Sequence, residues 1–499
     1  MQPIAFYTSG HGFGHASRDI ELLNELGRRR PGTPVIVRTS APRWLFDLTL
    51  TRPIDWAPVE CDTGVVQIDS LRLDVRETMA RACRFHAQLD RRAAEEAAWL
   101  RERGVGLVVG DIPPLAFAAA HHAGLPSVAL GNFTWDWIYE GYRDDTPDGC
   151  AVIEQVRAAY ASSDLALRLP MHGGFSSIGV IEDLPFIARL STRSPSDVRE
   201  AMGLSSHRPL VLLSFGGYGL QQIDLDAAAM LDGYTIVLTA DVTANRRTGS
   251  VPGGSGDRRF PANMVLLDEQ ALYDCGFRYE DLVGAVDVVM TKPGYGIIAE
   301  CIANDTAIVY TSRGHFVEYD VLVREMPRWL RCRFISNEDL LAGRWQAALD
   351  AVLRQPPPPE RAEVDGAARA ATRNLKRHGI RACWFLQLGY PPEDWHDILL
   401  TRNLVREEAP DEIGVSVAYP LPGTVFHERQ LEELGPQRNW RDTDELAMLF
   451  RGTFDTAFYR DVRDALHAEA PSGVIDDARW AALGLRADAH RQERPRLRA

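Results

Sequence analysis

The stretch DVVMTKPGYGIIAE, residues 287–300, decides the fold of this chain. An apolar, strand-like run ends in a glycine-containing loop, and a helix-like run begins directly after it. This is the strand–loop–helix order of a doubly wound α/β unit. The free backbone amides at such a helix start suit a diphosphate, and Lys292 could offset part of its charge. No Walker lysine–serine pair follows the glycines, so the loop does not indicate an ATPase.

Two polar features follow this loop. Glu300 falls nearly two turns inside the expected helix, where its carboxylate could accept hydrogen bonds from both hydroxyls of a ribose. After the next strand comes the polar loop SRGHFVEYD, residues 312–320, whose side chains could hold sugar hydroxyls. Each of these residues could also be an ordinary solvated residue. We favour a binding site because two loops of complementary chemistry close consecutive strands.

The same alternation of short apolar runs and amphipathic segments extends outward on both sides. It predicts strands at 3–8, 35–38, 106–109 and 127–130, and then a second series at 209–214, 234–238, 264–267, 286–290 and 307–310. Strands that are apolar throughout and alternate with helices indicate parallel sheets covered on both faces. The sequence therefore predicts two doubly wound, Rossmann-like domains with a cleft between them, where ligands bind beyond the carboxyl ends of the strands.

Two segments separate the expected domains. Residues 191–196 are rich in Ser, Thr and Pro, and residues 356–359 are four prolines, which fit neither a helix nor a central strand. We place an N-terminal Rossmann-like domain at residues 1–195 and a second one at 196–365. A third segment, 366–499, differs in pattern and is expected to end in a disordered, Arg-rich tail from Arg486.

A second glycine loop, SGHGFGH at residues 9–15, lies between the first strand and the first helix. A dinucleotide site would need an acidic residue at the end of the second strand. That strand ends Val37-Arg38-Thr39-Ser40, so NAD binding is the weaker interpretation. A glycine-rich turn with a solvated histidine is the simpler alternative.

His15 is the candidate base of this loop, because it would lie at a helix start and face the cleft. Histidine titrates near neutrality and can accept a proton from an attacking hydroxyl. Asp111 closes another strand on the same sheet edge and could orient the imidazole, as a carboxylate does in hydrolase triads. Asp111 would also serve as a helix N-cap. His11 is the second candidate base.

The bulk composition fits a globular protein and excludes several classes. The 499 residues carry a formal net charge of −14, which argues against a nucleic-acid binder. The 7 cysteines are scattered and form no CxxC pair, so neither a disulfide framework nor a zinc site is expected and a cytoplasmic location fits. No signal peptide or membrane-spanning run is expected. A peripheral membrane contact is compatible with this composition.

Five segments resemble GT-B glycosyltransferases, specifically the group related to the bacterial N-acetylglucosaminyltransferase of peptidoglycan synthesis: residues 10–18, 110–126, 132–136, 214–220 and 292–300. The nearest similarity is to the glycosyltransferase-like N-terminal part of plant L-arabinokinases, over about residues 1–365. The resemblance implies an inverting, metal-independent hexosyltransferase that uses an NDP-sugar, most often a UDP-sugar. The kinase half of those proteins has no counterpart here, so sugar phosphorylation is not expected.

The resemblance also implies roles by position: residues 1–195 form the acceptor-side domain and residues 196–365 the nucleotide-sugar-binding domain. It makes His15 the base and Asp111 its partner. It implies a nucleotide-sugar site formed by Gly14, Gly216, Gly217, Lys292, Gly294, Tyr295, Gly296, Glu300, His315 and Glu318. Within that set, residues 294–296 match the diphosphate loop, Glu300 the ribose ligand and Glu318 the donor-sugar contact. No metal or cofactor is implied, and the acceptor is not specified.

The last segment resembles a different family. Residues 386–391 and 416–424 are similar to the closing strands of the barrel in B12-binding-domain radical SAM enzymes. Those enzymes ligate a [4Fe–4S] cluster through a CxxxCxxC motif, whereas Cys383 is the only cysteine of this region. We therefore expect an incomplete α/β-barrel fragment without an iron–sulfur cluster.

Three hypotheses follow for the whole chain. The first is an active glycosyltransferase acting on a nucleotide-sugar donor and an unidentified acceptor. The second is a non-catalytic nucleotide-sugar-binding or scaffold fusion protein. The third, a radical SAM enzyme, is disfavoured by the missing cysteines.

Overall fold

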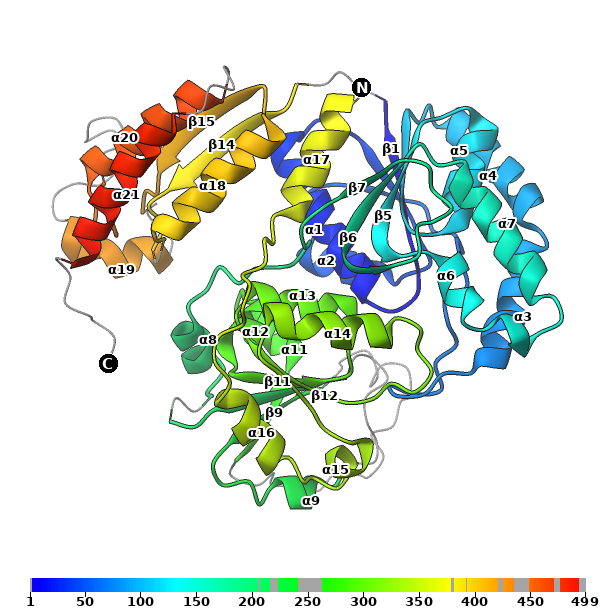
Figure 1. Ribbon diagram of the computed structural model, residues 1–499, viewed down its shortest axis with the longest axis horizontal. Coiled ribbons are helices and arrows are strands. Elements are labelled where there is room, and N and C mark those ends of the chain that lie inside the picture. Colours follow the sequence, from blue (N-terminus) through cyan, green and yellow to red (C-terminus); the bar gives the residue numbers. More distant parts are fainter. Residues whose placement is uncertain are drawn as a thin grey trace. The chain divides into compact units, whose positions relative to one another are not determined.

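The computed structural model describes residues 2–204, 207–215, 223–240, 263–377, 381–391, 393–420, 425–434, 448–470 and 476–492 (Figure 1). The chain divides into two compact units, Met1–Ala368 and Arg369–Ala499. The first unit holds two parallel sheets, each with helices beside it, and the second holds a smaller α/β arrangement.

The first sheet has 7 strands in the order β3-β2-β1-β4-β5-β6-β7, and every pairing is parallel. Its strands are β1 (Ile4–Thr8), β2 (Val35–Arg38), β3 (Asp55–Trp56), β4 (Leu107–Asp111), β5 (Ser127–Phe133), β6 (Leu165–Gly173) and β7 (Ile181–Asp183). The helices between them are α1 (Gly14–Arg29), α2 (Arg43–Thr49), α3 (Val75–His86), α4 (Leu89–Glu102), α5 (Pro114–Ala123), α6 (Trp135–Glu140), the 3₁₀ turn η1 (Arg143–Asp145) and α7 (Gly149–Ala161).

The second sheet has 6 parallel strands in the order β10-β9-β8-β11-β12-β13. Its strands are β8 (Leu210–Ser214), β9 (Thr235–Ala240), β10 (Met264–Asp268), β11 (Val288–Thr291), β12 (Ala307–Tyr310) and β13 (Cys332–Phe334). Its helices are α8 (Pro195–Ala201), α9 (Leu225–Ala228), α11 (Glu269–Asp274), α12 (Tyr279–Ala285), α13 (Tyr295–Ala303), α14 (Tyr319–Trp329), α15 (Asn337–Leu341) and α16 (Gln346–Leu353).

Both sheets are wound in the same way, and this positions the site. Strand order reverses between β1 and β4 in the first sheet and between β8 and β11 in the second. Ligands of doubly wound sheets bind in the crevice at such a switch point, beyond the carboxyl ends of the strands. The loops after β1 and β11 are the two glycine loops that the sequence indicated.

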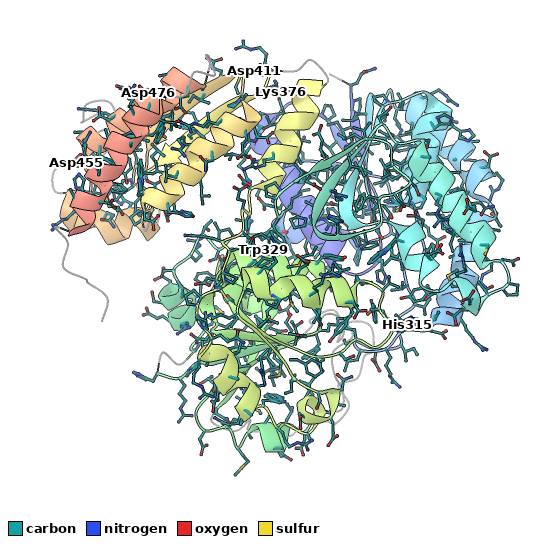
Figure 2. The ribbon with its side chains drawn as sticks, viewed as in Figure 1. His315, Trp329, Lys376, Asp411, Asp455 and Asp476 are labelled. Atoms are coloured by element: carbon teal, nitrogen blue, oxygen red, sulfur yellow. The ribbon has the colours of Figure 1, made fainter. Side chains whose placement is uncertain are left out.

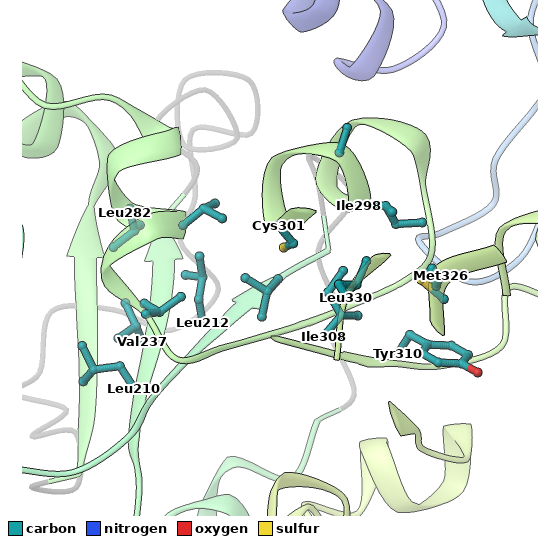
Figure 3. Packing of buried hydrophobic residues seen from close by; sticks show 14 of the residues in the cluster. Leu210, Leu212, Val237, Leu282, Ile298, Cys301, Ile308, Tyr310, Met326 and Leu330 are labelled. Atoms are coloured by element: carbon teal, nitrogen blue, oxygen red, sulfur yellow. The ribbon is translucent and has the colours of Figure 1, made fainter. Parts of the chain in front are cut away.

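Apolar side chains of the strands and helices form the cores. In the second sheet Leu212, Val237 and Ile308 belong to one hydrophobic cluster with Ile298 and Cys301 of α13, and all five are fully buried (Figure 3). Burying one such aliphatic side chain contributes about 1.5–3 kcal/mol. This packing fixes α13, and with it the loop at the start of that helix.

The second unit contains one βαβ element in its described residues. Strands β14 (Cys383–Leu388) and β15 (Glu412–Val417) are parallel and joined by α18 (Trp395–Glu408). The remaining helices are α19 (Val425–Leu434), α20 (Thr456–Glu469) and α21 (Asp477–Gln492), while α17 (Gly366–Arg377) crosses the boundary between the units. No closed barrel is formed by the described strands of this unit.

The predicted fold class, α/β with two doubly wound parallel sheets, is confirmed. Most predicted strands begin and end within two residues of the observed ones. One expectation was wrong in part, because the polar segment from Arg486 is helical as far as Gln492. The reason is that α21 is amphipathic and buries Trp480, Leu483 and Ala487 in the core of its unit.

Candidate active site

The two glycine loops meet at the starts of α1 and α13. A Cβ placed on Gly296 would lie 3.4 Å from Cα of Gly14, so the two helix starts are in direct contact there. Beside this contact is a cavity of about 600 Å³ lined by residues from both sheets. The ring of Tyr295 stacks on Phe133, with 5.9 Å between ring centroids, and both residues line the cavity. The site therefore joins the switch points of the two sheets.

His15 and Asp111 form a hydrogen-bonded pair on the first-sheet side. Asp111 ends β4 and is in register with Thr8, the last residue of β1, while His15 stands at the start of the helix that follows β1. The distance from His15 Nδ1 to Asp111 Oδ1 is 3.0 Å, and Asp111 is fully buried. His15 also lines the cavity. A carboxylate at Nδ1 leaves Nε2 as the proton acceptor of a neutral imidazole.

Arg18 completes this pair and was not predicted from the sequence. Its Nη2 lies 2.6 Å from both carboxylate oxygens of Asp111, and its Nε donates to Oδ2 at 3.1 Å. Its Nη1 donates to Asn132. Burial alone would raise the pKa of Asp111, but Arg18 and His15 lower it below its usual value. A signal for Arg18 was present, because residues three apart share a helix face.

Two further carboxyl groups are buried close to this pair. Asp62 accepts a hydrogen bond of 3.0 Å from Trp135 Nε1, and burial raises its pKa. Asp19 is fully buried, and its pKa is raised by burial and by the charge of Asp111. Three carboxyl groups, those of Asp111, Asp62 and Asp19, are therefore buried near this end of α1.

His11, the second candidate base, also lines the cavity, with its Nε2 3.3 Å from Nε2 of Gln67. Burial and the neighbouring His15, Arg313 and Lys292 lower the pKa of His11 to about 3. A group with so low a pKa is a weak base, which argues against His11. The hydrogen bond to Asp111 distinguishes His15.

The second-sheet side of the cavity carries cations. Burial and the neighbouring Arg313 lower the pKa of Lys292 to about 7, and its Nζ lies 3.4 Å from Oε1 of Gln67. Arg313 donates from Nη1 to the Pro293 carbonyl at 2.9 Å and lies 3.5 Å from Oε1 of Glu318. Arg313 was not predicted as a site residue. It contacts the glycine loop from the loop that follows the neighbouring strand β12.

The structure brings most of the predicted nucleotide-sugar residues together. The cavity is lined by Gly14, His15, Lys292, Gly294, Tyr295, Gly296 and Glu318. Asp111 lies behind His15. Gly216 and Gly217 lie outside the described residues.

Two predicted residues do not line the cavity. The Glu300 carboxylate accepts hydrogen bonds from Nε and Nη2 of Arg189 instead. His315, labelled in Figure 2 on the loop before α14, is exposed, and its ring packs against Tyr142 with 5.4 Å between centroids. The Tyr142 hydroxyl also donates to the His315 carbonyl at 3.0 Å. His315 is therefore packed against Tyr142 and is not among the residues that line the cavity.

No group of three or more His, Cys, Asp or Glu side chains that could hold a metal ion occurs in the described part of the chain. The helices described here include none that is long and apolar enough to cross a membrane.

Comparison with known proteins finds a relative that matches this chain over part of its own length. No protein-family model matches the chain. It is 28% identical to L-arabinokinase of Arabidopsis thaliana over 356 residues, which cover 70% of this chain and 32% of that protein. The chain thus spans about a third of the length of this curated relative. The predicted resemblance to L-arabinokinases is confirmed, whereas the resemblance of residues 366–499 to radical SAM enzymes stays a prediction.

Among solved structures, the chain is similar to the glycosyltransferase of kitacinnamycin and to the calicheamicin glycosyltransferase CalG4. Each is 16% identical, with a TM-score of 0.48 over 76% of this chain; the shares of those chains covered are 96% and 98%.

Proposed function

We propose that this protein is a glycosyltransferase that moves a sugar from a UDP-sugar to a hydroxyl acceptor by a single inverting displacement without a metal ion. The observation that carries this proposal is the His15–Asp111 pair, whose histidine lines the same cavity as the glycine loop of the second sheet. A base and an anion-binding helix start at one cavity are the two groups that such a transfer needs.

The chemistry follows from the positions of these groups. The acceptor hydroxyl gives its proton to Nε2 of His15 as its oxygen forms a bond to the anomeric carbon. The bond from that carbon to the diphosphate oxygen breaks, and the nucleoside diphosphate leaves with the bonding pair. Attack from the face opposite the leaving group inverts the anomeric centre.

Fixed charges stabilise both ends of this displacement. Asp111 stabilises the imidazolium that forms on His15 and holds the ring in place through its 3.0 Å bond. On the other side, free amides at the start of α13 and the Lys292 ammonium offset the charge of the departing diphosphate. This division of charge is the basis for proposing metal-independent transfer.

Two other functions remain as outcomes of the test. The name of the relative, L-arabinokinase, suggests sugar phosphorylation as an alternative function. The loop after β11, however, lacks the lysine–serine pair of a P-loop. A non-catalytic nucleotide-sugar-binding protein would have no use for a paired histidine and aspartate beside the binding loop.

The deciding experiment measures UDP release from a panel of UDP-sugars, with and without pooled hydroxyl acceptors. Acceptor-dependent release that is absent in His15→Ala is expected. ATP-dependent phosphorylation of L-arabinose in place of UDP release would replace this proposal with a kinase. Tight UDP binding without any turnover would indicate the non-catalytic alternative.

A further inference from the structure

A short hairpin from the first sheet's half reaches the second sheet. Residues 66–74 lie between β3 and α3, and an antiparallel bridge joins Gln67 to Leu73 within them. The amide of Asp74 donates to the Val66 carbonyl at 2.8 Å. The segment therefore forms a closed turn, the 66–74 hairpin.

The tip of the 66–74 hairpin is buried against the second sheet. Leu71 is 8% exposed and belongs to the hydrophobic cluster that includes Leu213 of β8 and Met290 of β11. Ser70 is fully buried, and its Oγ donates to the carbonyl of Phe215, directly after β8, at 2.8 Å. A segment of the first sheet's half thus contributes to the core of the second.

At the base of the hairpin, Gln67 connects the two glycine loops. The Nζ of Lys292 donates to Gln67 Oε1 at 3.4 Å, and Gln67 Nε2 lies 3.3 Å from Nε2 of His11. All three residues line the cavity. An amide nitrogen is only a donor, so the neutral His11 accepts at Nε2. Both ends of the Gln67 amide are used, and this fixes its orientation.

The contact with Gln67 bears on the charge of Lys292. Burial and the neighbouring Arg313 lower the pKa of Lys292 to about 7. A hydrogen bond that the ammonium donates to Gln67 favours the charged form. The other charged or titratable side chains around Lys292 come from the loop after β1, the hairpin and the loop after β12: His11, Asp69, Arg313 and Glu318.

We propose that the 66–74 hairpin is a positioning element of the candidate site: its buried tip places Gln67 so that the Gln67 amide oxygen holds the Lys292 ammonium at the cavity wall. Gln67 is then a positioning residue that acts through Lys292. This inference rests on the proposed function, because it assumes that Lys292 binds the diphosphate of the donor.

The test measures the dissociation constant of UDP-glucose between pH 6 and pH 9 by calorimetry on the full-length chain. Gln67→Met removes the acceptor at similar side-chain length, so the pH at which affinity begins to fall should decrease by about 0.5–1 unit. Binding should then be about 3–10-fold weaker than in the wild type at pH 8, and less than about 2-fold weaker at pH 6.

Gln67→Glu separates positioning from a merely structural role. A carboxylate attracts the ammonium more strongly than an amide does, so the pH at which affinity begins to fall should rise above the wild-type value. Loss of structure alone would weaken binding by the same factor at every pH, in both variants.

Leu71→Ala tests the hairpin itself. It removes most of the side chain that is buried against the second sheet and leaves Gln67 in the chain. The pH at which affinity begins to fall should decrease, as in Gln67→Met. If this variant fails to fold, Ser70→Ala replaces it with the same expected direction, because it loses only the bond to the Phe215 carbonyl.

Gln346→Met is the matched control. Gln346 is an exposed glutamine of α16 that donates to Asp350 at 3.0 Å, and it does not line the cavity. This variant should keep the wild-type dependence of affinity on pH.

The outcomes separate the claims. A folded Gln67→Met variant with the wild-type pH dependence, or shifts in one direction for Gln67→Met and Gln67→Glu, would overturn the role of Gln67. The wild-type dependence in the folded hairpin variants would overturn the role of the hairpin. UDP-glucose binding by the wild type that does not change with pH would refute the inference alone. A wild-type protein that binds no UDP-sugar would contradict the proposed function itself.

Discussion

Nη2 of Arg18 lies 2.6 Å from both carboxylate oxygens of Asp111, the residue that also accepts from His15. This contact places a permanent positive charge behind the proposed base. Asp111 therefore stays ionised in a fully buried position, where an unpaired carboxylate would take up a proton. The geometry of the candidate base thus depends on Arg18 as much as on Asp111.

Arg18→Met is expected to lower both stability and turnover. It leaves the Asp111 charge without its main partner, and removing one member of a buried ion pair costs about 3–5 kcal/mol. Urea unfolding gives the stability, and UDP release gives the turnover. Arg28→Met is the control on the same helix, because Arg28 is 57% exposed and its ion pairs are worth about 0–1 kcal/mol. Equal effects of the two substitutions would show that Arg18 has no special role.

Donor affinity should decrease as the pH rises through neutrality. Burial and Arg313 lower the pKa of Lys292 to about 7, so the ammonium is charged below this pH and neutral above it. The charged form of Lys292 attracts a diphosphate. At higher pH the neutral amine must take up a proton before it can do so, and this weakens binding. Other titratable groups lie near Lys292: the charges of Asp69 and Glu318 raise its pKa, and its own charge lowers the pKa of His11.

The measurement is the dissociation constant of a UDP-sugar between pH 6 and pH 9, a range in which the diphosphate ester stays ionised. Lys292→Met should bind more weakly and lose most of the pH dependence. An unchanged pH profile in that variant would assign the dependence to another group.

Chelation should leave the activity intact. The proposed transfer relies on the amides of α13 and on Lys292 to balance the diphosphate charge. Turnover in excess EDTA is expected to equal that of the untreated protein. Activity that falls with EDTA and returns with Mg²⁺ or Mn²⁺ would refute metal independence.

The second unit should assemble no iron–sulfur cluster. A cluster of this class needs three closely spaced thiolates, and Cys383 stands alone in residues 366–499. Anaerobic reconstitution with iron and sulfide, followed by iron analysis, should find no stoichiometric iron. The same sample should not cleave S-adenosylmethionine. Three to four iron atoms per chain with a charge-transfer spectrum would contradict this expectation.

Much of this architecture could be predicted because the signals are local. An apolar run, a glycine loop and a helix adjoin in the sequence at both switch points, and strand-end geometry then places His15 near Asp111 across 96 positions. Asp111 could be found because it closes a strand.

The residues that were missed depend on contacts between distant segments. Arg189 gives no local signal, because Glu300 is its partner only after the second sheet has formed. His315 does not line the cavity, and its role stays a prediction; its ring packs against Tyr142 of the first sheet's half, a contact that no local pattern indicates. Arg18 could have been predicted from the sequence, because it shares a helix face with His15.

The most direct test of the account is UDP release by His15→Ala at saturating UDP-sugar and acceptor. Loss of a general base typically costs 10²–10⁴-fold, so turnover should fall by about 100-fold or more. UDP affinity, measured on the same protein, should stay close to that of the wild type because the proposed nucleotide site lies at the second sheet. His11→Ala should retain substantially more activity. Wild-type turnover in His15→Ala, or a loss of that size in His11→Ala alone, would contradict the assignment of the base.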